Sequence, residues 1–260
     1  MKECSILRAS RKKQNNLIKL AYYAVSIVVW IIIWHIAAKA IDNEIFLPEP
    51  TKVLEVLVND LLPAEEFRAS LLASIMHIGQ GFCIGAVVGI IFAILSSLCG
   101  GIKIFLWLPI KVIKSVPVAS FVILTLLWFD AEQLAVVISA MVVLPTMYIN
   151  TLEGIRQTNE KLIDMTKVFR VSLKKRIVSI YVPSVIPFVL SASSLAVGMA
   201  WKAGIAAEII GLAKNSIGNE LYKAKLYLMI PELFAWTIVI VMLSVLCELL
   251  IKFVIKCVER

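Results

Sequence analysis

The sequence has few charged residues and few of the residues that most often bind metals. Asp, Glu, Lys and Arg make up 17% of its 260 residues, only two are histidine, and the five cysteines show no Cys-x-x-Cys spacing. It therefore offers no cysteine-histidine metal site and lacks the clustered ligands or bases of a membrane enzyme. It also has no Gly-x-x-x-x-Gly-Lys-[Ser/Thr] loop, so we expect no ATP hydrolysis by this chain.

Hydrophobic residues are abundant instead. They make up 60% of the chain and give it a mean hydropathy of +0.92, against roughly 45–50% apolar residues in soluble domains. The net charge is +8, but no basic stripe on a soluble face indicates nucleic-acid binding. The composition predicts an all-α integral membrane protein.

Apolar runs of roughly 20 residues are needed to span a bilayer as helices, and the chain has about six. The first run is too long for a signal peptide, and no small-residue cleavage site follows it. We expect a basic cytoplasmic N-terminus at 1–16, a first helix at 17–41, an external linker at 42–68 and a transmembrane core at 69–257 that includes the cytoplasmic loop 153–183. The later spans are expected at 69–99, in a shorter run that ends at Phe129, and at 132–152, 184–212 and 233–256.

Positive charges predict the orientation of these helices, because Lys and Arg in short loops stay in the cytoplasm. With both termini inside, the cytoplasmic segments hold nineteen of the 26 Lys and Arg, and the external segments hold five. We therefore expect a multi-pass protein of the cell membrane with both ends in the cytoplasm.

The third apolar run is interrupted by lysines and prolines, and proline bends a helix. We expect an interfacial helix at 102–114 whose lysines extend to the membrane surface, followed by a short or tilted span from Ser115 to Trp128. In the alternative, Lys111 or Lys114 lies in the pore and attracts an anion.

The second span carries small residues at four-residue spacing, which lets helix backbones approach closely in lipid. We expect this ladder to pack against another helix through Gly81, Gly85, Gly89 and Ala93. His77 interrupts the ladder and His35 lies in the first span. Each is expected to form an interhelical hydrogen bond, with a proton relay as the alternative.

The segment 153–183 is the longest cytoplasmic stretch, and it is too polar to enter lipid. Its pattern predicts two short helices, from Asn159 to about Phe169 and from Leu173 to Ile180, the second with Ser172 as its N-cap. We expect a cytoplasmic partner to dock here.

The block Asp164-Met165-Thr166, followed by Arg170 and later by Val182-Pro183, resembles the Glu-Ala-Ala loop of ATP-binding-cassette importer permeases. That family's loop holds a coupling helix that sits in a groove of the ATPase subunit. The resemblance implies a contact with the ATPase by Asp164, Met165, Thr166, Phe169, Arg170, Val171 and Ser172. Arg170 stands where the family has glycine, so either the loop turns differently and Arg170 contacts an acidic ATPase surface, or the partner groove has diverged.

Further matches cover nearly the whole chain and resemble the nitrate, sulfonate and taurine branch of this family, which also includes thiamine-precursor permeases. They lie at Leu47–Val53, Ser70–Gly89, Lys114–Ala119, Asn150–Gly154 and Ala200–Ile210. The resemblance implies a homodimer of this chain on a homodimer of ATPase subunits that bind ATP and Mg. An external binding protein would deliver a small organic solute whose identity the sequence does not give.

The translocation pathway is expected to involve Pro117, Met199, Trp201, Lys202 and Glu208. A charged pair in one span is costly unless it faces protein or water. The alternative for Lys202 and Glu208 is a structural ion pair, within the chain or across a dimer. The alternative function is a secondary transporter or channel, which would use buried carboxylates or broken helices near the midplane.

Overall fold

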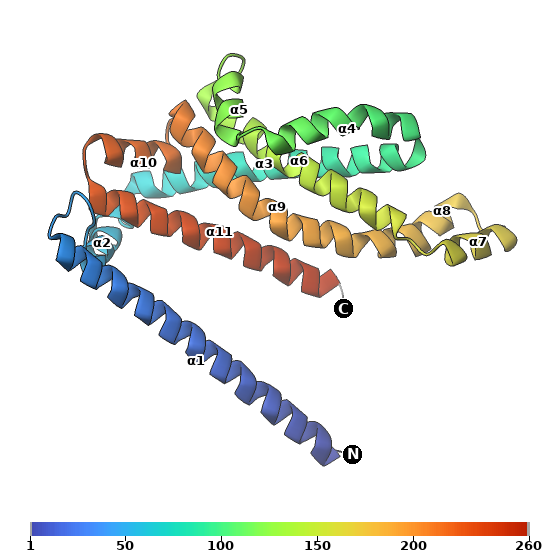
Figure 1. Cartoon of the computed structure of the whole chain (residues 1–260), viewed down its shortest axis with the longest axis horizontal. Coiled ribbons are helices and arrows are strands. Elements are labelled where there is room, and N and C mark those ends of the chain that lie inside the picture. The colour runs from blue at the N-terminus through green and yellow to red at the C-terminus, as the bar shows by residue number, and fades with distance from the viewer. Residues whose placement is uncertain (1, 259–260) are drawn as a thin grey trace. The chain divides into compact units, whose positions relative to one another are not determined.

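The computed structural model describes residues 2–258, with side chains for residues 21–253 and residue 255. The described residues form helices and no strand (Figure 1), which confirms the all-α prediction. The chain divides into two compact units, Met1–Pro63 with Ala224–Ala235, and Ala64–Lys223 with Trp236–Arg260.

The first unit contains α1 (Lys2–Ile41), α2 (Pro50–Glu55) and the π-helix η1 (Val56–Leu61). The stretch Ala21–Ile41 is long and apolar enough to span a membrane, in agreement with the first predicted span. Most of its large apolar side chains are exposed. Lipid is the environment in which such a helix is stable, because its backbone hydrogen bonds are made within the helix and its side chains are apolar.

The end of α1 is fixed by polar and aromatic contacts within this unit. The indole Nε1 of Trp34 donates a hydrogen bond to the carbonyl oxygen of Pro48 at 3.1 Å, and the Trp34 ring stacks on Phe234 with centroids 5.7 Å apart. His35 Nδ1 lies 3.7 Å from a carboxylate oxygen of Glu49. His35 therefore faces the loop that follows α1.

The second unit is built on three long helices, α3 (Glu65–Leu98), α6 (Ala131–Arg156) and α9 (Val182–Gly211), in which α6 packs against both of the others (Figure 1). Glycine has no side chain, and the glycines of α3 let this helix approach α6 closely. A Cβ atom at Gly85 would lie 2.5 Å from the carbonyl oxygen of Ala140, and one at Gly89 would lie 2.7 Å from that of Leu144. The four-residue ladder therefore lies directly against α6, with Gly81 and the buried Ala93 on the same face.

His77 lies on α3 but does not make the interhelical hydrogen bond that we expected. Its Nδ1 atom is buried and has no hydrogen-bond partner among the described residues. The neighbouring ladder residues are small, so the close approach of the helices is set by backbone contact and not by a polar pair.

The third apolar run forms α4 (Gly100–Ser115) and α5 (Val118–Thr125), which are bent by 104° to each other. Proline restricts the residue before it to extended conformations, and Val116 has φ −79° and ψ 133°, so the helix breaks there. With eight residues, α5 is about 12 Å long, whereas the hydrocarbon core is about 30 Å thick. The expectation of a span from Ser115 to Trp128 is therefore wrong, since α5 can cross the membrane only together with α4.

The polar segment after α6 is more helical than expected. It forms α7 (Glu160–Val168), α8 (Leu173–Arg176) and the π-helix η2 (Ile177–Tyr181), which continues directly into α9. The second predicted short helix is thus the start of the continuous helix Leu173–Gly211, which contains the fifth candidate span.

Two further helices, α10 (Ile217–Leu226) and α11 (Ile230–Val258), complete the described chain. Five helices are long and apolar enough to cross a membrane, and the bent pair α4 and α5 would make a sixth crossing. This agrees with the predicted count of about six.

Candidate functional site

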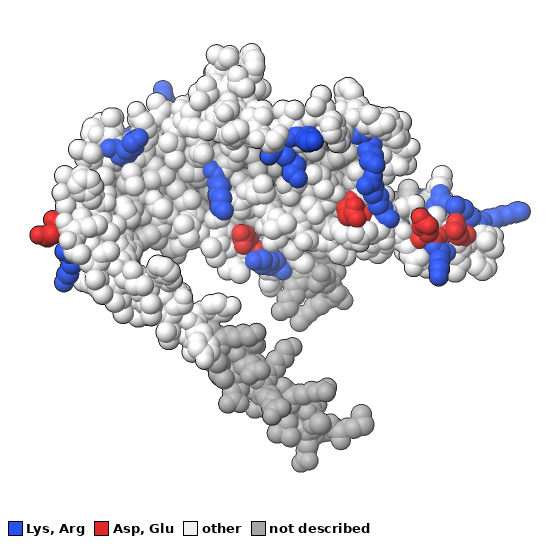
Figure 2. Space-filling model, viewed as in Figure 1, with Lys and Arg blue, Asp and Glu red and all other residues white. Residues whose placement is uncertain are grey.

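The α7 region carries a concentration of charge at one end of the second unit. Lys, Arg, Asp and Glu gather over α7 and α8, whereas most of the same face is uncharged (Figures 1 and 2). Asn159 precedes α7 and its side chain accepts a hydrogen bond from the Lys161 backbone N–H at 3.0 Å. This cap satisfies one of the free amides at the helix start, so α7 has a defined beginning in an otherwise polar loop.

Large apolar side chains on α7 and just after it are exposed within this charged region. Val168 is 79% exposed, Phe169 72% and Met165 52%, and Leu162 is also exposed. Leu162, Met165 and Phe169 follow i, i+3, i+7 spacing, so they form one stripe on the helix. An apolar stripe of this spacing is the pattern by which a helix binds in a groove of another protein. We call these four residues the α7 stripe.

Arg170 ends α7 in a left-handed conformation, with φ 49°. Its N–H donates to the Lys167 carbonyl at 3.1 Å, and the Val171 N–H donates to the Thr166 carbonyl at 2.9 Å. These two bonds form a Schellman cap, which usually has glycine at the left-handed position. The loop therefore makes the turn that a glycine would make, and the expectation of a different turn is wrong.

Replacing Arg170 by glycine is expected to stabilise this cap. A left-handed L-residue costs roughly 1–2 kcal/mol, so Arg170→Gly should slow hydrogen exchange at the amides of residues 170 and 171 by about fivefold or more. Arg170→Val should speed it, because β-branched residues tolerate positive φ poorly. Hydrogen exchange read by mass spectrometry on the purified protein measures both, and equal exchange in all three proteins would contradict the strain.

The other residues predicted to contact the ATPase differ in how far their side chains are exposed. Asp164 is exposed and pairs with Lys167 at 2.8 Å, and Val171 and Ser172 are also exposed. Thr166 is 7% exposed and its hydroxyl donates to the Ile163 carbonyl at 2.6 Å. The Thr166 side chain therefore packs largely within its own chain and offers little surface to a partner, so its contact with the ATPase stays a prediction.

Leu162 was not among the predicted contact residues. The signal for it is present in the sequence as the first member of the i, i+3, i+7 series with Met165 and Phe169. The family block begins two residues later, so attention to the block alone misses the start of the apolar stripe.

The residues predicted for the pathway do not come together. Trp201 and Glu208 are buried inside the second unit, so their side chains do not border an open path in this conformation. Met199 and Lys202 lie on an exposed face of α9, and Pro117 is exposed at the break between α4 and α5. The alternative ion pair between Lys202 and Glu208 is not formed within the described residues: Lys202 is exposed, whereas Glu208 Oε2 accepts hydrogen bonds from Ser74 and Gly218 and Glu208 Oε1 is buried without a hydrogen-bond partner there.

Glu208 joins three helices of the second unit. It is 0% exposed, and its Oε2 accepts hydrogen bonds from the Ser74 hydroxyl at 2.7 Å and from the Gly218 N–H at 3.1 Å. Ser74 Oγ in turn accepts from the Ile217 N–H at 3.0 Å. A Cβ atom on Gly218 would collide with the Glu208 side chain, so α10 approaches α9 closely because residue 218 is glycine.

Substitutions at Glu208 are expected to show whether its hydrogen-bond acceptor stabilises the fold. Glu208→Gln keeps an oxygen acceptor at this position, whereas Glu208→Leu leaves the Ser74 hydroxyl and the Gly218 amide without a partner. Each unsatisfied buried group costs about 1–3 kcal/mol, so the leucine variant should unfold at a clearly lower temperature than the glutamine variant. Thermal denaturation in detergent measures this, and equal melting temperatures would show that the acceptor does not matter.

Comparison with known proteins identifies the family of the chain. The family described as binding-protein-dependent transport system inner membrane component matches residues 81–260. Among its relatives, a Bacillus subtilis permease named for aliphatic sulfonates transport is 24% identical over 246 residues, which cover 94% of this chain and 87% of the relative.

Two further relatives come from Synechococcus elongatus. The bicarbonate transport system permease protein is 27% identical over 220 residues, covering 82% of this chain and 79% of the relative. The nitrate import permease protein is 26% identical over 233 residues, covering 85% and 82%. With the helical membrane architecture and the exposed polar segment around α7, these matches show that the chain belongs to the inner-membrane permease family of binding-protein-dependent ATP-binding-cassette importers.

Proposed function

We propose that this chain, paired with a second copy of itself, forms the membrane pathway of an importer driven by a separate ATPase homodimer. The observation that carries the proposal is the α7 stripe, which exposes Met165, Val168 and Phe169 to solvent at the position of the family's coupling helix. Exposed apolar side chains grouped on one face indicate a protein contact. ATP and Mg would be held by the ATPase, and an external binding protein would deliver the solute.

The helices that follow α7 would carry a movement at the proposed ATPase contact into the membrane. Residues 169–172 link α7 to α8, and α8, η2 and α9 then follow one another without a break, so this short link would carry a displacement of α7 to the base of the fifth span. The exposed face of α9 that includes Met199 and Lys202 is the part of this span that we assign to the pathway. Closure of the ATPase dimer on ATP would thus change which side of the membrane the pathway faces.

The proposed solute is a small organic solute of the sulfonate, nitrate or taurine type. The support is that relatives covering most of this chain are named for sulfonates, bicarbonate and nitrate. A thiamine-precursor-like solute is the alternative within the same branch.

Uptake by a purified assembly tests this function. Liposomes that contain the chain with its co-purified subunits, and that are loaded with ATP or with ADP, are given the binding protein and radiolabelled taurine, nitrate or bicarbonate. We expect accumulation of one of these probes only in ATP-loaded liposomes. Accumulation in ADP-loaded liposomes driven by a proton or sodium gradient would instead show a secondary transporter.

A further inference from the structure

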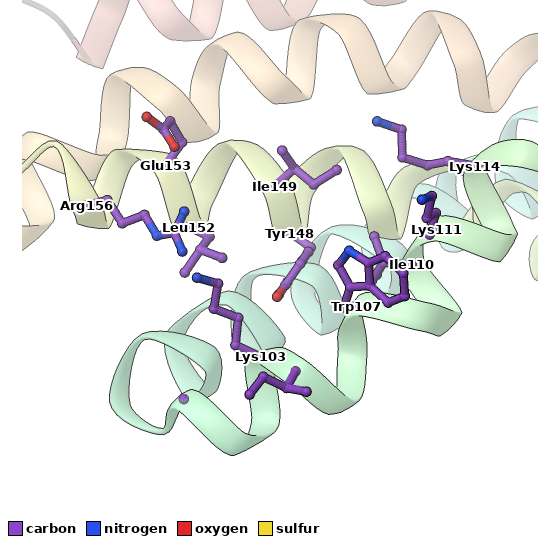
Figure 3. Close-up of a pocket in the computed structure, with 12 residues that line it drawn as sticks. Lys103, Trp107, Ile110, Lys111, Lys114, Tyr148, Ile149, Leu152, Glu153 and Arg156 are labelled. Atoms are coloured by element: carbon purple, nitrogen blue, oxygen red, sulfur yellow. The ribbon is translucent and has the colours of Figure 1, made fainter.

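A cavity of about 670 Å³ opens between α4 and α6, and four basic side chains line it (Figure 3). Lys103, Lys111 and Lys114 come from α4, and Arg156 comes from the last turn of α6. All four lie in the second unit. The cavity lies outside the α7 stripe, and none of the residues that we assigned to the pathway lines it.

The positive charge of the cavity is not neutralised by the chain itself. None of the four cations forms an ion pair with a described residue. Glu153 is the one acid among the lining residues, and its carboxylate accepts a hydrogen bond from Gln157 at 2.9 Å. In Figure 3 Glu153 points to the opposite side of α6 from Lys103.

Two of the cations reach the same end of the cavity from different helices. Lys103 and Arg156 extend into it from α4 and α6 (Figure 3). Like charges gathered in a hollow raise the local concentration of anions. Arginine beside lysine also combines a planar two-donor group with a compact charge, which suits the oxygens of a sulfonate, carboxylate or phosphate.

The rest of the lining is apolar. Ile104, Trp107, Ile110 and Leu152 are among its residues, and Lys111 Nζ lies 4.8 Å from the centroid of the Trp107 ring. The long lysine stems add further apolar surface beneath their charged ends. A ligand that matches both parts has an anionic head group on an apolar body.

We propose that the cavity between α4 and α6 is a binding site for the oxoanion group of an amphiphile. Two sources supply this chemistry: a small soluble anion with an alkyl body, or an anionic phospholipid of the surrounding membrane. Basic pockets between membrane helices near the cytoplasmic surface are known to bind lipid head groups. The site does not depend on transport activity, so binding is measured independently of the proposed function.

The test uses the purified complex in nanodiscs of phosphatidylcholine. In one arm hexanesulfonate is titrated by calorimetry, with hexanol as the uncharged control. In the other arm the nanodiscs contain equal amounts of phosphatidylglycerol and phosphatidylcholine, and the lipids retained by the protein are counted by native mass spectrometry. Binding of hexanesulfonate alone identifies a soluble anion, and selective retention of phosphatidylglycerol identifies a lipid.

Matched variants assign the binding to this cavity. The double variant Lys103→Gln with Arg156→Gln should weaken the binding of either ligand about tenfold or more. The variant Lys103→Arg should retain binding. Lys174→Gln with Lys175→Gln removes the same charge from exposed positions on α8 and should leave binding unchanged. Absence of binding in both arms, equal binding of hexanol, or equal weakening by the two double variants would overturn the proposal.

Discussion

Replacing Met165 and Phe169 together by serine is expected to abolish stimulation of the partner ATPase while the chain still inserts and folds. Both side chains are more than half exposed in the single chain, so their loss removes little packing within it. Burying each in a partner groove is worth about 1.5–3 kcal/mol. Losing both should weaken docking by roughly 100-fold or more.

The matched control is Glu160→Ser, an exposed residue on the opposite side of the same helix. ATP hydrolysis by the reconstituted complex, measured over a range of ATPase subunit concentrations, compares the two proteins. The control should follow the unmodified complex. Full stimulation of the Met165 and Phe169 variant at the same ATPase concentration would show that the α7 stripe is not the docking surface.

Replacing Gly85 by leucine is expected to prevent the chain from accumulating as a folded protein. A Cβ atom at this position would lie 2.5 Å from the Ala140 carbonyl oxygen and 2.9 Å from the Val143 Cβ. A backbone atom cannot move aside as a flexible side chain does, so α3 and α6 would have to separate. Even Gly85→Ala should cost about 1–3 kcal/mol, as overpacking typically does.

Gly79 provides the comparison, because it lies on α3 with nothing within 4 Å of the position of a Cβ atom. Gly79→Leu should be tolerated, since only its position relative to α6 differs from that of Gly85→Leu. Yield and elution profile in gel filtration, followed by thermal denaturation of the soluble fraction, measure both variants. Equal yields would contradict the close packing of α3 on α6.

The features of the fold that depend on a regular spacing of residue types were predictable from the sequence. Apolar runs and the spacing of Gly81, Gly85 and Gly89 identify the spans and the close face of α3, because helix periodicity converts sequence spacing into a spatial face. The helix start at Asn159 was expected, but its side chain caps α7 while the predicted cap, Ser172, makes no side-chain capping hydrogen bond.

Other features depend on neighbours far away in the sequence or on backbone conformation. The 104° bend between α4 and α5 leaves a proline signal at Pro117, but the angle is set by packing. Glu208 finds Ser74, which is 134 residues away, only because α3 packs against α9. Arginine rarely adopts a left-handed conformation, so the only sign of one at Arg170 is the glycine that the family has at this position.

The most direct test of the central claim is to purify the tagged chain gently from membranes, identify the proteins that accompany it, and measure ATP hydrolysis with and without it. The account predicts a P-loop ATPase in equal numbers with this chain and hydrolysis that depends on the chain. A chain that purifies alone and still transports solute in vesicles without ATP would contradict it.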